Sequence, residues 1–166
     1  MALIDKSTAE VSDKGIAVDI YGPDGADLNM KWYVKGSDSQ TYLDTERKIH
    51  NRQLEYGKRV KDFAAGLDYD QQQMAKVEKL VACVIGWEEQ KEDGSWKPTI
   101  ELAAGEELTC TPENVKKILK NRGFFWLQNQ IQKAVDNPAG FLQKAPGSSL
   151  PAPSPASPTI HLEKTE

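Results

Sequence analysis

The stretch GIAVDIYGPDGADLNMKWYVK, residues 15–35, decides the fold. Two runs alternate between apolar and other residues, 16–21 and 28–35, and this period of two is typical of strands that bury one face. Between them, Gly22-Pro23-Asp24-Gly25 combines the fixed φ of proline with the permissive φ of glycine. The sequence therefore predicts a β-hairpin. Because an isolated hairpin is marginal in water, its apolar face must lie on helices, on further strands or on a partner.

A helix is expected after the hairpin. Ser37 or Asp38 can cap it, and its helical period continues to about Phe63. Its apolar stripe repeats every seven residues, at Tyr42, Ile49, Tyr56 and Phe63. The positions between these residues on the same face are polar, so only half of the stripe is apolar.

A second helix follows, capped by Asp68 or Asp70 and ended by Gly86 and Trp87. Its stripe is fuller and consists of Met74, Val77, Val81, Val84 and Ile85. Residues 88–110 are predicted to be connective, with a turn at 91–94 and a short strand at 99–102. A hairpin that runs back through Val81–Trp87 is an alternative, because periodicity does not distinguish the two structures in a short apolar run.

Two further helices form a predicted helical hairpin. Thr111-Pro112-Glu113 starts the first of them, since threonine can cap, proline is tolerated at the first helical position and an acidic side chain suits the positive end of the dipole. Asn121-Arg122-Gly123 ends it, and the next helix runs to Asn137-Pro138. Beyond Lys144 the chain is rich in proline, serine and alanine, which predicts a disordered tail.

Together these signals predict an α+β fold, with an N-terminal β-hairpin packed on a small helical domain of about four helices. The expected organisation is a hairpin region at 1–36, a helical domain at 37–144 with a loop or short-strand insertion near 88–110, and a disordered tail at 145–166.

Composition narrows the functional classes. The chain has 166 residues, 21 Lys and Arg against 25 Asp and Glu, a formal net charge of −4, and two cysteines. This acidic excess argues against a dedicated nucleic-acid binder, and two cysteines are too few for a disulfide framework. No apolar run approaches the roughly 20 residues that a membrane span requires. We therefore expect a soluble protein of a reducing cytoplasm that does not interact with membranes.

Reactive constellations are scarce in this sequence. It contains no phosphate-binding glycine loop, and its two histidines lie far apart, His50 on the charged first helix and His161 in the tail. The carboxylates near residues 88–107 lie in polar, turn-rich contexts, where they are expected to be solvated charges. The sequence thus predicts a protein that is not an enzyme and that has no catalytic residues, no cofactor and no metal site.

The aromatic residues near position 125 allow two binding hypotheses. Lysines and Arg122 precede Phe124-Phe125-Trp126, and such a pattern can contact phosphates and stack on bases. However, Phe124 and Leu127 fit the core stripe of the last helix, so a small nucleic-acid-binding regulator is only an alternative. Phe125 and Trp126 are expected to point away from that stripe.

Exposed apolar patches often mark protein–protein contacts, and aromatic anchors dominate such interfaces. The predicted partner-binding residues are Tyr42, Ile49, Tyr56, Phe125 and Trp126. Alternatively, the two patches meet each other inside one domain.

The order of signals over residues 15–142 resembles a known family. Gly86-Trp87, Asp93-Gly94 and Thr111-Pro112-Glu113-Asn114-Val115 are followed by Leu119, Ile131 and Phe141. This outline is similar to that of the tail assembly chaperones of tailed bacteriophages, which are encoded between the tail-tube and tape-measure genes. The segment Gln90–Cys110 and the proline-rich tail depart from the outline.

The resemblance implies a non-enzymatic role in virion morphogenesis, in the cytoplasm of the infected host. The implied partners are the tape-measure protein, which such chaperones keep soluble, and the tail-tube protein, whose subunits they recruit. An alternative is a structural virion component, either tail-associated or at the head–tail joint.

Overall fold

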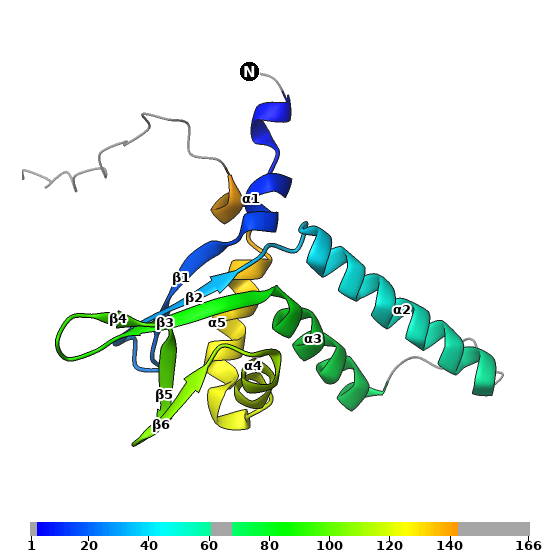
Figure 1. Ribbon diagram of the computed structural model, residues 1–166. Coiled ribbons are helices and arrows are strands. Elements are labelled where there is room, and N and C mark those ends of the chain that lie inside the picture. Colours follow the sequence, from blue (N-terminus) through cyan, green and yellow to red (C-terminus); the bar gives the residue numbers. More distant parts are fainter. Residues whose placement is uncertain (1–2, 61–67, 143–166) are drawn as a thin grey trace, which may run out of the picture.

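The computed structural model describes residues 3–60 and 68–142 (Figure 1). These residues form an α+β fold, as predicted. The elements in chain order are α1 (Ala9–Lys14), β1 (Ile16–Tyr21), β2 (Asp27–Val34), α2 (Gln40–Val60), α3 (Tyr69–Cys83), β3 (Val84–Gln90), β4 (Trp96–Lys97), β5 (Thr99–Ala103), β6 (Glu106–Thr109), α4 (Pro112–Leu119) and α5 (Phe125–Val135). Short 3₁₀ helices lie at Leu3–Lys6, Arg122–Phe124 and Pro138–Phe141.

The predicted N-terminal hairpin is confirmed. β1 and β2 pair in antiparallel fashion, with Val18 opposite Trp32. In the connecting turn the Gly25 N–H donates to the Gly22 carbonyl at 2.9 Å, and Gly25 has a φ of 82°. This positive φ is the conformation that glycine adopts without steric cost, which explains why the turn forms at this place.

The hairpin is part of a larger sheet, because β3 pairs antiparallel with the other edge of β2. The strand order is β1-β2-β3-β4. The prediction that the second helix continues through Val84 and Ile85 is therefore wrong, since α3 ends at Cys83. The alternative of a hairpin through Val81–Trp87 is confirmed in part: Val84–Trp87 lies in β3, which pairs with β4, whereas Val81–Cys83 belongs to α3. Val84 and Ile85 are β-branched, which favours a strand; Val84 pairs with Val34 of β2, Ile85 lies in a bulge, and Trp87 pairs with Trp32 and is buried.

One face of the sheet forms the core. Trp32 is fully buried at its centre, and the ring centroid of Trp87 lies 5.0 Å from that of Trp32. α3, α4 and α5 supply the helical side of this core, and the buried residues of the cluster are Ile20, Trp32, Val34, Val77, Leu80, Cys83, Val84, Trp87, Ile100, Val115, Ile118, Leu119, Leu127, Ile131 and Val135. The opposite face is polar, and there the Tyr33 hydroxyl donates to Glu88 at 2.7 Å.

A second, two-stranded sheet joins the core through β3. The predicted strand at 99–102 is confirmed as β5, and it pairs with β6. The Trp87 indole N–H donates to the Leu108 carbonyl of β6 at 3.1 Å, and Ile100 of β5 is buried in the core. Trp87 therefore holds both sheets together.

The helix caps agree with the sequence in two of three cases. Asp68 caps α3 by accepting from the Gln71 N–H at 2.8 Å, and Thr111 caps α4 by accepting from the Asn114 N–H at 3.2 Å. The cap predicted for α2 at Ser37 or Asp38 is wrong, because Ser39 accepts from the Tyr42 N–H at 3.3 Å.

Asp38 instead accepts hydrogen bonds from two hydroxyl groups. Thr8 donates from the position just before α1, and Ser12 donates from within α1. Burial raises the pKa of Asp38, but the hydrogen bonds from Ser12 and Thr8 outweigh this effect and lower the pKa overall. Asp38 thus fixes α1 beside the start of α2.

The predictions for Phe63 and for the proline-rich tail at 145–166 lie outside the described residues.

Replacing Trp32 tests the position of the core. We expect Trp32→Ala to lower the free energy of unfolding by about 3–5 kcal/mol, because it removes a large, fully buried side chain. Trp96→Ala is the matched control, since Trp96 is 39% exposed and contacts Lys31 by a cation–π interaction. Trp96→Ala should lower the free energy of unfolding by about 1 kcal/mol or less. Urea denaturation measures both, and equal losses would contradict this description of the core.

Candidate protein-binding surface

α2 is attached to the rest of the fold by little apolar contact. It extends outward beside α3 (Figure 1), and of its 21 residues only Ile49 and Gly57 are buried. Polar contacts supply much of the remaining attachment to α3. The Arg52 guanidinium donates to Glu78 at 2.6 Å, and Lys79 lies 3.6 Å from Glu46. A helix of this length normally buries a broad apolar stripe, so α2 offers surface for a further contact.

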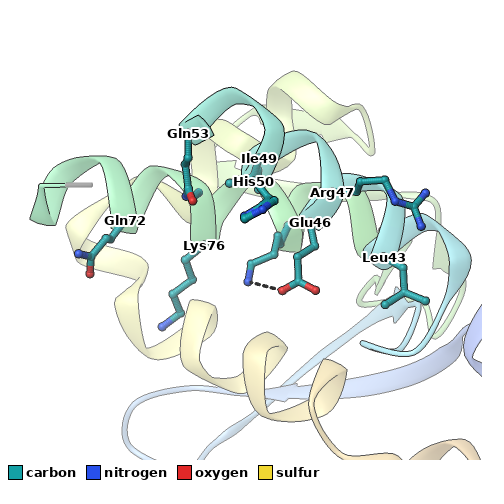
Figure 2. A pocket seen from close by; sticks show the side chains of 10 residues that line it. Leu43, Glu46, Arg47, Ile49, His50, Gln53, Gln72 and Lys76 are labelled. Atoms are coloured by element: carbon teal, nitrogen blue, oxygen red, sulfur yellow. Dashed lines mark ion pairs between the residues drawn. The ribbon is translucent and has the colours of Figure 1, made fainter. Parts of the chain in front are cut away.

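A groove of about 690 Å³ lies along one side of the α2–α3 contact (Figure 2). Leu43, Ile49 and Ala75 form its apolar part. Its polar part includes Lys76 and the ion pair between Glu46 and Lys79 that Figure 2 marks. This groove combines a small apolar floor with a charged rim.

A second surface lies around Met74. Two grooves of about 360 and 390 Å³ connect Met74 with α2 and with the start of α4, and Tyr56 lines the first of them. A third groove, of about 570 Å³, connects Met74 with Tyr69 and Phe125. Exposed fractions are 47% for Tyr56, 71% for Tyr69, 39% for Met74 and 51% for Phe125. We call these four residues the Met74 surface.

The Met74 surface unites two of the five predicted partner-binding residues, Tyr56 and Phe125, which are 69 positions apart in the chain. Their common neighbour is Met74, which the sequence analysis assigned to a core stripe. Tyr69 was also missed, although an aromatic residue in the first turn of a helix, outside its apolar stripe, is a usable signal. Exposed aromatic and methionine side chains that share grooves have the composition of protein-binding sites.

Of the other three predicted residues, Ile49 lines the groove that contains Tyr56 and Met74, whereas Tyr42 and Trp126 lie outside the grooves around Met74. Ile49 is only 6% exposed, between α2 and α3, and Tyr42 is half-buried with the Lys79 ammonium 5.3 Å from its ring centroid. Trp126 packs against the core and meets Phe124 edge to face at 6.4 Å between centroids. The prediction that Trp126 points away from the core is wrong, because the buried side of α5 is wider than the predicted stripe and includes Trp126 at its edge.

Cationic side chains border the Met74 surface. Lys116, Lys120 and Arg122 line its grooves, and none of the three forms an ion pair within residues 3–60 and 68–142. Arg52 differs, because it pairs with Glu78, and that hydrogen bond raises the pKa of the Arg52 guanidinium. The surface is therefore apolar in its middle and carries unpaired positive charge along one edge.

Reactive groups are not gathered on this surface. Cys83 is fully buried, and desolvation raises the pKa of its thiol to about 12, which keeps it protonated. In the part of the chain that the structure describes, no three His, Cys, Asp or Glu side chains are grouped so that they could hold a metal ion. Among the same residues no helix combines the length and the apolarity needed to cross a membrane.

Comparison of the chain with protein-family models, with curated proteins and with solved structures finds no match.

Phe125 and Trp126 are adjacent in the chain but differ in environment, so they form a matched pair. Phe125→Ala should change the free energy of unfolding by less than about 0.5 kcal/mol, because the ring is half exposed. Trp126→Ala should lower it by about 2–3 kcal/mol, since its ring packs against the core. Thermal or urea denaturation distinguishes them. A larger loss for Phe125 than for Trp126 would show that the assignment of the two side chains is reversed.

Proposed function

We propose that this chain is a non-enzymatic tail assembly chaperone of a tailed bacteriophage. It binds the tape-measure protein and tail-tube subunits transiently, in the host cytoplasm, while the tail is assembled. The Met74 surface is the observation that supports binding, because it exposes three aromatic rings and a methionine around shared grooves. The resemblance of residues 15–142 to the chaperone family supports the identity of the partners.

The chemistry of these grooves suits the shielding of a helix. An amphipathic helix can place its apolar face in a groove lined by aromatic and aliphatic side chains and bury it there. Methionine adapts to differently shaped neighbours because it is unbranched and has three rotatable bonds. Adaptable packing fits a chaperone that must hold successive segments of one long helical protein and later release them.

Co-expression with the tape-measure protein tests this proposal. The wild-type chain should keep the tape-measure protein soluble and co-purify with it. Replacing Tyr56, Met74 and Phe125 together by serine should reduce the co-purified amount at least about tenfold, because truncating anchor residues of an interface usually costs more than 1 kcal/mol each. The variant should keep its far-ultraviolet circular dichroism spectrum, since all three side chains are exposed.

The matched control replaces exposed apolar residues of the hairpin. Tyr21 and Leu28 are 45% and 36% exposed and lie outside the grooves around Met74. Tyr21→Ser with Leu28→Ser should leave co-purification unchanged. Equal effects of the two variants would contradict binding through the Met74 surface. Stoichiometric amounts of the chain in purified mature virions, measured by mass spectrometry, would contradict the chaperone role and favour a structural virion component.

A further inference from the structure

We propose that the Met74 surface selects an amphipathic helix that carries acidic residues beside its apolar stripe. This inference rests on the proposed function only in that the surface binds protein, and it adds the chemistry of the bound segment. The charge distribution over the fold, the unpaired cations at the grooves and the shape of the grooves support it.

Charge is divided between the helical and the sheet parts of the molecule. Residues 40–60, 68–83 and 112–122, which contain α2, α3 and α4, carry 11 Lys and Arg against 7 Asp and Glu. Residues 15–35 and 84–110, which contain the six strands, carry 4 against 10. The segments that contain α2, α3 and α4 are therefore net positive, although the net charge of the whole chain is −4. Net positive segments attract acidic partners and repel basic ones.

Three of the cations that line the grooves around Met74 form no salt bridge within residues 3–60 and 68–142. Lys116 and Lys120 are four residues apart at one side of α4, a spacing at which like charges on a helix repel each other. Arg122 follows in the same groove as Lys120. Within the described residues these three side chains form no salt bridge, whereas Lys117 on the same helix pairs with Glu106 at 2.9 Å. Carboxylates of a bound segment would relieve this repulsion.

We call Lys116, Lys120 and Arg122 the cationic row. Acidic groups of the chain itself offset the charge of this row only in part. Glu78 is already paired with Arg52, through two hydrogen bonds of 2.6 and 3.4 Å. Asp70 and Glu113 also line the grooves, but they contribute two charges against the three of the row. A positive excess thus borders the groove floor, and a partner gains most when it combines aliphatic side chains for the floor with carboxylates for the edge.

This combination favours a helix over the other possible occupants. The phosphates of a nucleic acid would pair with Lys116, Lys120 and Arg122, and its bases can stack on the exposed rings, but a nucleic acid has no aliphatic side chains to pack on Met74. A second copy of this chain carries its excess carboxylates mainly on strands and turns, such as β5 and β6, rather than beside the apolar stripe of a helix. An acidic amphipathic helix supplies both kinds of contact from one face.

Two synthetic peptides of about 20 residues, long enough to span roughly 30 Å as a helix, test the proposal. Both carry the same leucine stripe, flanked by glutamate in one peptide and by lysine in the other. Fluorescence anisotropy of labelled peptides gives their dissociation constants. The glutamate peptide should bind the full chain at least about tenfold more tightly than the lysine peptide, because several ion pairs of modest individual strength add up. Added salt should reduce this difference because it screens the charges.

Charge reversal tests whether the cationic row causes this preference for the glutamate peptide. Lys116→Glu, Lys120→Glu and Arg122→Glu together should reverse the preference in favour of the lysine peptide. The matched control, Lys48→Glu with Lys58→Glu and Lys133→Glu, makes the same change in net charge at exposed positions outside the grooves around Met74. It should keep the preference for the glutamate peptide. Circular dichroism shows whether each variant is folded.

Five results would overturn the inference. Equal binding of both peptides, or a preference that both triple variants change alike, would show that the row does not select acidic helices. Displacement of the glutamate peptide by a single-stranded oligonucleotide of lower dissociation constant would favour nucleic acid. Self-association that only the groove variant abolishes would favour a second copy. Failure of both peptides to bind while the tape-measure protein still co-purifies would reject this inference and leave the proposed function standing.

Discussion

The burial of Trp32 against Trp87 is the contact on which the rest of the structure depends. The two rings, 5.0 Å apart, bring β2 and β3 into one sheet and give α3, α4 and α5 a common apolar face to cover. Trp87 also bonds to the carbonyl of Leu108 and so attaches the second sheet. Because this single core takes up the apolar faces of three helices, little is left for α2, which buries Ile49 and Gly57 only.

This division of the apolar surface explains where the binding surface lies. α3 faces the core with Val77 and Leu80, while Met74, one turn earlier, lies where α2, α4 and α5 diverge. Tyr56 and Phe125 line two grooves that share Met74, and Lys116, Lys120 and Arg122 border these grooves. The same packing that completes the core therefore leaves an apolar, positively edged surface, on which the proposed function rests.

Much of the fold was predictable because its signals are local. The hairpin turn at Gly22–Gly25, the cap at Asp68 and the start of α4 at Thr111 each depend on a few neighbouring residues. The change from helix to strand at Val84 was left open by the sequence, because it depends on pairing with β2, about 50 residues earlier. Of the candidate site, exposed aromatic residues at 56 and 125 were predicted, whereas their meeting at Met74 depends on how α3 packs between α2 and α5. The position of Trp126 was predicted wrongly because the buried side of α5 is wider than the stripe that the sequence pattern indicates.

Hydrogen exchange of backbone amides tests the central claim most directly, because it reports the stability of α2 separately from that of the sheet. The account predicts that amides of α2 exchange at least about tenfold faster than those of β2 in the free chain, since local opening of α2 exposes little apolar surface. It also predicts that α2 gains protection when a helical partner occupies the Met74 surface. Equal protection of α2 and β2 in the free chain, unchanged by the partner, would contradict the account.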